Sequence, residues 1–254
     1  MTAESVGAEA LRIDPRDRGT EAPRTDPMPS AASTDPIENA PGADRLREQM
    51  IAVARRFSDR IASDDIVFIG VCGSVSYTPN PGDDIDLVIV CRNGTLWRSL
   101  LRCFFAQRRA KVPELCLSLT MDEDGACRLF DASHDYLTAS DAAHVIPLRG
   151  GDWYERLLRR SPSVFEYFPE RRVPGVEPLP DPRAVRAPLD AALFFLTAAY
   201  LEAKALVKNH QYRRRGWRER VFRTVVSPHQ FWFDSERYRQ LRMAGRPAPA
   251  AVPR

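Results

Sequence analysis

The stretch that most constrains the fold is a pair of aspartates, Asp84 and Asp86, separated by one apolar residue at the start of an apolar run. An earlier apolar run, Ile66–Val71, leads into Gly73-Ser74. Side chains alternate between the faces of a strand, so both aspartates would project to one side while their apolar neighbours face the core. The pattern predicts two neighbouring strands, with a Gly-Ser corner ending the first and two carboxylates opening the second.

These residue types suit a site for a metal ion and a phosphate. Mg²⁺ favours oxygen ligands, and Asp84 and Asp86 supply them. Gly73 lacks a Cβ and lets the backbone approach a phosphate closely, and Ser74 can donate hydrogen bonds from its hydroxyl and amide groups. The alternative is a hairpin whose aspartates only keep a strand end soluble, but like charges on one face repel each other without a cation.

The succession of Gly73-Ser74, nine residues and Asp84-Ile85-Asp86-Leu87 resembles the signature of the nucleotidyltransferase superfamily typified by DNA polymerase beta. The resemblance covers roughly residues 44–130, and the later part is similar to the helical tails of bacterial stand-alone nucleotidyltransferase-domain proteins. It implies an α/β (α+β) fold, in which a small mixed β-sheet is packed with helices.

The chemistry implied by this resemblance is transfer of a nucleoside monophosphate from a nucleoside triphosphate, such as ATP, with release of pyrophosphate. Asp84 and Asp86 would bind two Mg²⁺ ions, which Mn²⁺ can replace, and Gly73 and Ser74 would contact the triphosphate. The sequence does not identify the acceptor, which could be a small molecule, a protein side chain or an RNA end.

The same family carries a third carboxylate on a following strand, often as the general base. Glu114 is the best candidate, because strand alternation places it on one polar face with Cys116 and Ser118. Asp122 is the alternative, although it falls in an expected turn. If neither residue reaches the two aspartates, the chain would be a nucleotide-binding regulatory module with weak catalysis.

Turn signals and composition predict how the chain is organised. Helical spacing of apolar residues begins after Pro41-Gly42, and Thr95 can cap a helix that runs to about Arg109. A strand is expected over Val112–Thr120, followed by a hairpin turn and a short strand, Ala126–Phe130. The expected parts are a disordered N-terminal segment (1–42), a nucleotidyltransferase core (43–135), a helical extension (136–168), a linker (169–187), a helical basic C-terminal region (188–243) and a disordered tail (244–254).

Charge is unevenly distributed along the chain. Residues 1–44 hold nine acidic residues and four arginines, whereas residues 209–254 hold eleven arginines and three acidic residues. A basic segment attracts nucleic acid, and the aromatic residues Phe231–Phe233 could stack a base. His229 and the clustered arginines could instead contact a triphosphate. A solvated basic surface and aromatic core packing are the plainer interpretations, so a nucleic-acid-associated protein is a second alternative.

Cysteine usage and hydropathy predict a cytoplasmic protein without a membrane partner. The five cysteines are scattered and form no Cys-x-x-Cys pair, a pattern typical of buried free thiols in a reducing compartment. The most apolar run, Ala191–Leu201, is shorter than the roughly 20 residues that span a bilayer. It belongs to a long apolar helix, expected from Leu189 to about His210, which predicts a second packing surface or a contact between copies in a homo-oligomer.

Overall fold

The computed structural model describes residues 43–112, 115–132, 135–183, 185, 187–214 and 223–234. Its helices are α1 (Ala43–Ile61), α2 (Leu96–Ala110), α3 (Glu123–Asp131), α4 (Tyr136–His144), α5 (Gly151–Leu158), α6 (Pro162–Tyr167) and α7 (Pro188–Arg214), with short 3-10 turns η2 (Gly73–Ser76) and η3 (Pro169–Arg171). Its strands are β1 (Ile66–Cys72), β2 (Ile85–Cys91), β3 (Leu115–Asp122), β4 (Ile146–Arg149), β5 (Arg223–Ser227) and β6 (Gln230–Asp234).

The described strands form one mixed sheet in the order β4-β1-β2-β3-β6-β5. β1 pairs antiparallel with β2 and β4, β2 runs parallel to β3, and β6 lies antiparallel between β3 and β5. Helix α2 makes the crossover that a parallel pair requires. The predicted fold class, a mixed sheet with packed helices, is confirmed. The segments predicted to be disordered, 1–42 and 244–254, lie outside the described residues.

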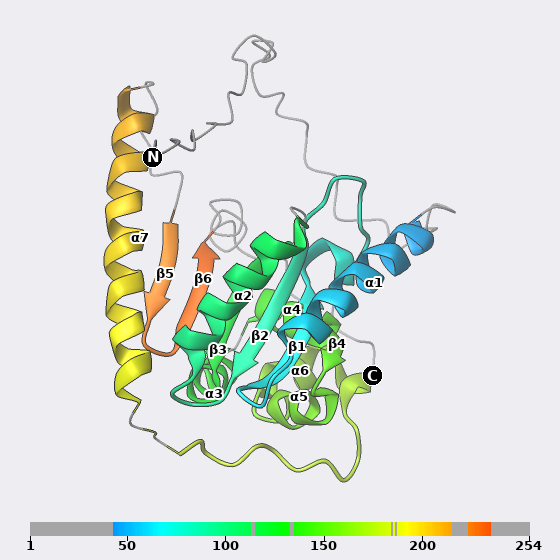
Figure 1. Ribbon diagram of the computed structural model, residues 1–254. Coiled ribbons are helices and arrows are strands. Elements are labelled where there is room, and N and C mark those ends of the chain that lie inside the picture. Colours follow the sequence, from blue (N-terminus) through cyan, green and yellow to red (C-terminus); the bar gives the residue numbers. More distant parts are fainter. Residues whose placement is uncertain are drawn as a thin grey trace, which may run out of the picture. The chain divides into compact units, whose positions relative to one another are not determined.

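Helices cover both faces of the sheet, with α1 and α2 on one face and α3 to α6 on the other (Figure 1). Alternate residues of β2 feed the two cores: Ile85, Leu87 and Ile89 pack toward α1 and α2, whereas Val88 and Val90 pack toward α3 to α6. Since Asp86 has the same alternation as Val88 and Val90, its side chain projects from the face that carries α3 to α6.

Three elements differ from the sequence prediction. The turn and strand expected over residues 122–130 are the helix α3, because Asp122 caps its N-terminus by accepting a hydrogen bond from the Gly125 amide at 2.8 Å. The edge strand β4 was not predicted, since four residues that include a proline carry little periodicity. Of the C-terminal region expected to be helical, the described residues form the helix α7 and, over residues 223–234, the hairpin β5–β6.

The start of α2 is capped from a distance. Thr95 stands at the N-cap position but makes no side-chain cap bond, and its hydroxyl bonds instead to the carbonyl oxygens of Asp65 and Arg92. Asp190 of α7 accepts hydrogen bonds from the backbone amides of Trp97 at 2.9 Å and Arg98 at 3.0 Å. A buried carboxylate at a helix N-terminus stabilises the helix dipole, so this contact fixes α7 against α2.

Candidate nucleotide and metal site

The structure brings the Gly-Ser corner and the two aspartates together. β1 ends at Cys72, and η2 follows with Gly73 and Ser74 in its first turn. β1 and β2 are antiparallel with Cys72 opposite Asp86, so the corner lies beside the start of β2. The juxtaposition expected from the spacing of the two runs is therefore present.

Gly73 is required at this corner for two reasons. Its φ of +69° lies in the left-handed region, which residues with a Cβ rarely adopt. A Cβ added here would also collide with Oδ2 of Asp86 and come within 3.2 Å of its Cγ. The glycine thus lets the Asp86 carboxylate lie directly against the backbone of the turn.

Asp86 is a half-buried carboxylate with carboxylate neighbours. Burial is the largest cause that raises its pKa above the ordinary value, and the negative charges of Asp84 and Asp83 raise it further. Hydrogen bonds from the side chains of Cys116 and Ser118 act in the opposite direction and only partly offset these effects. Asp84, which precedes the strand, is exposed. A cation placed beside the two carboxylates would remove the repulsion between them.

Two thiols flank Asp86, one from each neighbouring strand. Cys72 lies opposite it on β1, and Cys116 lies beside it on β3. Burial and the negative charge of Asp86 raise the pKa of Cys72 well above its ordinary value and raise the pKa of Cys116 to about 12. Both thiols therefore keep their protons at neutral pH and act as small, weakly polar neighbours of Asp86.

Helix α1 fixes the turn that follows Gly73. The guanidinium of Arg47 donates from Nε to the carbonyl oxygen of Val75 at 3.1 Å, and from Nη2 to the carbonyl oxygen of Ser76. The Ser76 hydroxyl donates to the carbonyl oxygen of Gly73 at 2.8 Å. Sequence reasoning missed Arg47, because its partners lie 28 and 29 residues away and nothing local distinguishes it from the other arginines of α1.

Tyr77 connects the same turn to α4. Its hydroxyl lies 3.0 Å from Oγ of Ser140 and donates to Oδ1 of Asp141 at 3.2 Å, while its ring packs on His144 with centroids 4.6 Å apart. Burial, followed by the charge of Asp141, raises the pKa of Tyr77, so the phenol keeps its proton. Tyr77 therefore anchors the turn to α4.

Neither candidate for the predicted third carboxylate is seen beside Asp86. Glu114 lies outside the described residues. Asp122 lies at the other end of β3: it pairs with Cys91, whereas Cys116 pairs with Asp86. Six residues of strand separate Asp122 from Cys116, which corresponds to about 20 Å. Among the described residues no group of three His, Cys, Asp or Glu side chains is placed to hold a metal ion.

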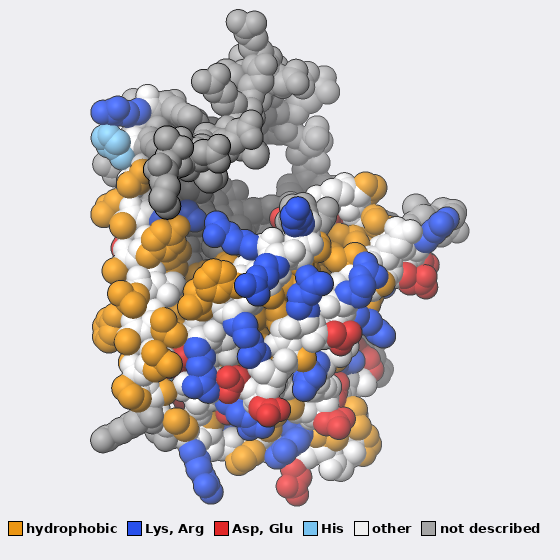
Figure 2. Space-filling model, viewed as in Figure 1, with side chains coloured by type: hydrophobic (Ala, Val, Ile, Leu, Met, Phe, Trp, Pro, Cys, Tyr) orange, Lys and Arg blue, Asp and Glu red, His pale blue; other side chains and the backbone are white. Residues whose placement is uncertain are grey.

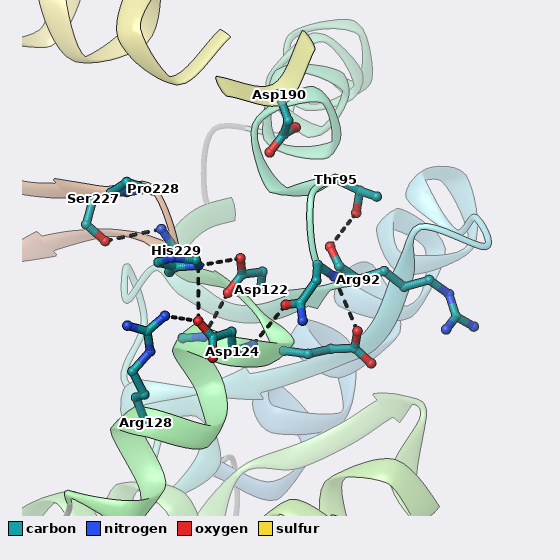
Figure 3. Close-up of polar contacts among 12 residues, drawn as sticks. Arg92, Thr95, Asp122, Asp124, Arg128, Asp190, Ser227, Pro228 and His229 are labelled. Carbon is teal, nitrogen blue, oxygen red and sulfur yellow. Dashed lines mark hydrogen bonds and ion pairs between the residues drawn. The ribbon is translucent and has the colours of Figure 1, made fainter. Parts of the chain in front are cut away.

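Asp122 belongs instead to a clasp between β3, α3 and the β5–β6 turn (Figure 3). Nδ1 of His229 lies 2.8 Å from Oδ2 of Asp122, and the Asp122 amide donates to the His229 carbonyl oxygen at 3.1 Å. Burial is the largest cause that raises the pKa of Asp122, while the Gly125 amide and His229 oppose it. The imidazole of His229, which the sequence offered as a triphosphate contact, therefore contacts the buried carboxylate of Asp122 instead.

The aromatic trio divides between core and surface. Phe231 is buried and packs edge-on against Trp97 and Phe104, which accords with the core-packing interpretation. Trp232 is half-buried and pairs with Leu119. The side chain of Phe233 lies outside the described set. None of the three pairs with the strand that carries Asp86.

Two adjoining cavities, of about 580 and 460 Å³, lie at the opposite end of the parallel strands from Asp86. Both are lined by Arg92, Glu123 and Trp153. Neither is lined by Asp84 or Asp86. We place the candidate site at the aspartates despite this, because positive φ, close backbone approach and clustered like charges occur there together.

No protein-family model, curated protein or solved structure matches the chain. Each helix among the described residues is too short or too polar to cross a membrane.

Proposed function

We propose that the chain is a Mg²⁺-dependent nucleotidyltransferase that moves a nucleoside monophosphate from a nucleoside triphosphate, such as ATP, to an acceptor and releases pyrophosphate. The observation that carries this proposal is the contact between Gly73 and Asp86. The corner that would hold phosphates lies directly against Asp86, one of the two carboxylates that would hold a cation. A hairpin that needed only a soluble strand end would have no reason to place a half-buried carboxylate beside two others.

The donor set at this corner fits a hard cation. Asp84 and Asp86 offer carboxylate oxygens, and the Ser118 hydroxyl lies within hydrogen-bond reach of Asp86. When bound there, Mg²⁺ would neutralise triphosphate charge and favour attack at the α-phosphorus. The chain's own residues would position the substrate: Gly73 admits the phosphates close to the backbone, and Ser74 donates hydrogen bonds to them. Arg47 keeps the turn in place by bonding to its carbonyl oxygens.

The test is transfer of label from α-labelled NTPs, each incubated with Mg²⁺ or Mn²⁺ and a cell extract as the acceptor pool. Wild-type protein should label an acceptor and release pyrophosphate. The double variant Asp84→Ala/Asp86→Ala should lose the signal, while Asp83→Ala, which removes a neighbouring carboxylate outside the Asp84–Asp86 pair, should keep most of it. Equal labelling by wild type and the double variant would refute the proposal.

A nucleotide-binding module with weak catalysis is the second candidate function. It is favoured by Cys116 and Ser118, which occupy the positions beside Asp86 on β3 where a third carboxylate would be expected. Metal-dependent nucleotide affinity, measured by calorimetry, without release of pyrophosphate would support this candidate. The variant Ser118→Asp offers a direct comparison, because it adds a carboxylate next to Asp86 and should raise transfer if that group is what limits it.

Association with nucleic acid is a further alternative. Most of the basic C-terminal segment lies outside the described residues, but Lys and Arg side chains also gather over α1 and α2 (Figure 2). This basic surface lies on the face of the sheet opposite the one from which Asp86 projects, so binding there need not involve the carboxylates. Salt-sensitive binding of RNA or DNA that is unchanged in Asp84→Ala/Asp86→Ala would favour this function.

A further inference from the structure

Helix α7 leaves an apolar stripe uncovered. Large apolar side chains along it are between 57% and 69% exposed, although most such residues in the rest of the described chain are buried. The stripe, which we call the α7 stripe, consists of Leu189, Phe195, Leu196, Tyr200, Leu206 and Val207. Figure 2 shows the hydrophobic side chains following α7 along the edge of the molecule. Apolar surface of this extent costs free energy in water unless a partner covers it.

The α7 stripe cannot be buried within the described chain, because the other side of α7 is already packed. Leu193, Phe194 and Leu201 contact the core beneath α2, and Phe194 packs on Trp97 with ring centroids 5.3 Å apart. Asp190 caps α2 and so fixes the rotation of α7 about its axis. Among the described residues, nothing covers the exposed side of α7.

The spacing of the α7 stripe fits another helix. Leu189, Leu196 and Tyr200 recur at intervals of seven and four residues, so they lie above one another on one side. Small exposed residues, Ala199 and Ala203, lie between the large ones. Large side chains alternating with alanines form the knobs and holes by which two helices interdigitate. The stripe runs from Leu189 to Val207, about 27 Å at the rise of an α-helix.

The area agrees with a dimer. At roughly 150–250 Å² for an aromatic side chain and somewhat less for an aliphatic one, the exposed fractions correspond to about 700 Å² of surface. The largest apolar patch on a typical monomer is about 300–600 Å², and a stable interface buries about 800 Å² from each partner. Leu101 and Phe105 of the neighbouring helix α2 are also exposed and would enlarge the contact.

We infer that the α7 stripe is the contact surface between two copies of this chain, which pair α7 against α7 in antiparallel orientation about a twofold axis. A twofold axis lets the same stripe serve both copies, with nothing else required to cover it. The centre of the stripe is near residue 198, so Ala199 would lie close to its mate in the partner copy. A membrane surface fits less well, because an interfacial helix carries a basic polar side opposite its apolar one, and that side of α7 is packed on the core.

The test uses the full-length protein in sedimentation equilibrium at micromolar concentration. Wild type should sediment at twice the single-chain mass of 28.7 kDa. The variant Leu196→Glu/Leu206→Glu should sediment as one chain with an unchanged circular dichroism spectrum, since it adds two charges to the stripe. Val173→Glu is the matched control, because it places the same charge on an exposed apolar residue outside α7 and should leave the dimer intact.

A second measurement decides the inference even if the double variant fails to fold. Ala199→Cys should form a disulfide-linked dimer on mild oxidation, whereas wild type, whose cysteines in the described structure are buried or half-buried, should not. Single-chain mass for wild type would overturn the inference, and binding of that monomer to lipid vesicles would show that a membrane covers the stripe instead. A dimer that persists in Leu196→Glu/Leu206→Glu, together with no cross-link in the Ala199→Cys variant, would also overturn it.

Discussion

Asp86 and Asp122 lie near opposite ends of the parallel strand pair β2–β3, and their surroundings differ sharply. Asp122 is almost fully buried but receives a backbone N–H from Gly125 and the imidazole of His229. Asp86 is only half-buried, yet its charged neighbours are Asp83 and Asp84, and its hydrogen bonds come from a thiol and a hydroxyl. Burial raises the pKa of both. Only Asp122 has basic residues, His229 and Arg128, among the described groups that shift its pKa.

The difference separates a structural carboxylate from one suited to a ligand. A buried carboxylate whose oxygens accept hydrogen bonds from the chain itself stabilises the fold, and its oxygens are not available to bind a ligand. A carboxylate held against like charges destabilises the fold until a cation arrives. The two ends of one strand pair should therefore respond to substitution in opposite ways, with activity lost at Asp86 and stability lost at Asp122.

The largest expected effect is on catalysis. Asp86→Asn should lower nucleotidyl transfer by about two to three orders of magnitude, the size expected when one preorganised electrostatic group is removed from a reacting centre. Asp122→Asn should leave the rate close to that of wild type, because Asp122 lies about 20 Å along the sheet. Initial rates with α-labelled NTP would measure both. An equal loss of transfer rate in Asp86→Asn and Asp122→Asn would show that the two ends of the β2–β3 pair do not differ in function.

The next effect is on stability at the Asp122 end. Asp122→Ala should lower the free energy of unfolding by about 2 kcal/mol, since it removes the N-cap of α3 and the 2.8 Å contact with Nδ1 of His229. Asp124→Ala is the matched control: Asp124 caps no helix, it pairs with the exposed Arg128, and it lies farther from Nδ1 of His229, at 3.5 Å, so the cost should stay below about 1 kcal/mol. Urea denaturation would compare them, and similar losses would contradict a special role for Asp122.

Substitutions of Gly73 and Gly82 should distinguish the cost of backbone strain from the effect of contact with Asp86. Gly73→Ala should destabilise the protein by roughly 1–2 kcal/mol through its positive φ, and should also lower transfer because the new Cβ displaces Asp86. Gly82→Ala also has a positive φ, but its Cβ would meet nothing within 4 Å, so it should cost only the backbone strain. If Gly82→Ala impaired transfer as strongly as Gly73→Ala, contact with Asp86 would not be the reason.

The smallest effect is a pH dependence at Asp122. Because the folded-state pKa is raised, the unfolded chain releases this proton first as pH increases. The stability of wild type relative to Asp122→Asn is therefore greatest below the ordinary aspartate pKa, and it should fall as pH rises through the raised folded-state value. Denaturation of both proteins from pH 4 to pH 7 would measure this. A difference that grows with pH would mean that His229 outweighs burial.

The local pattern predicted the centre of the fold well. The apolar run Ile66–Val71 matches β1 within a residue, the aspartate pair marks the start of β2, and the spacing of Gly73 and Asp86 predicted their contact. These features depend on short-range geometry, which a sequence encodes directly. The helical stripe of α1, of which Met50, Phe57 and Ile61 are buried, is predictable for the same reason.

Contacts between distant segments were not predictable. Nothing near Arg47 indicates that it bonds to Val75, and nothing near Asp190 indicates that it caps α2. Asp122 was interpreted as part of a turn because Asp-Glu-Asp-Gly is also a common turn sequence, and only the His229 hairpin reveals it as a cap and clasp. Glu114, the predicted third carboxylate, lies outside the described residues and stays a prediction.

The position of β6 has a consequence for how the chain is made. β3 is formed by residues 115–122, but its outer neighbour is contributed by residues 230–234, after the whole of α7. While a ribosome is still producing α7, the edge of β3 that β6 will cover has unpaired backbone N–H and C=O groups, and a strand of another chain could pair with them. Orderly folding of the sheet therefore depends on the last strand arriving before another chain pairs with that edge.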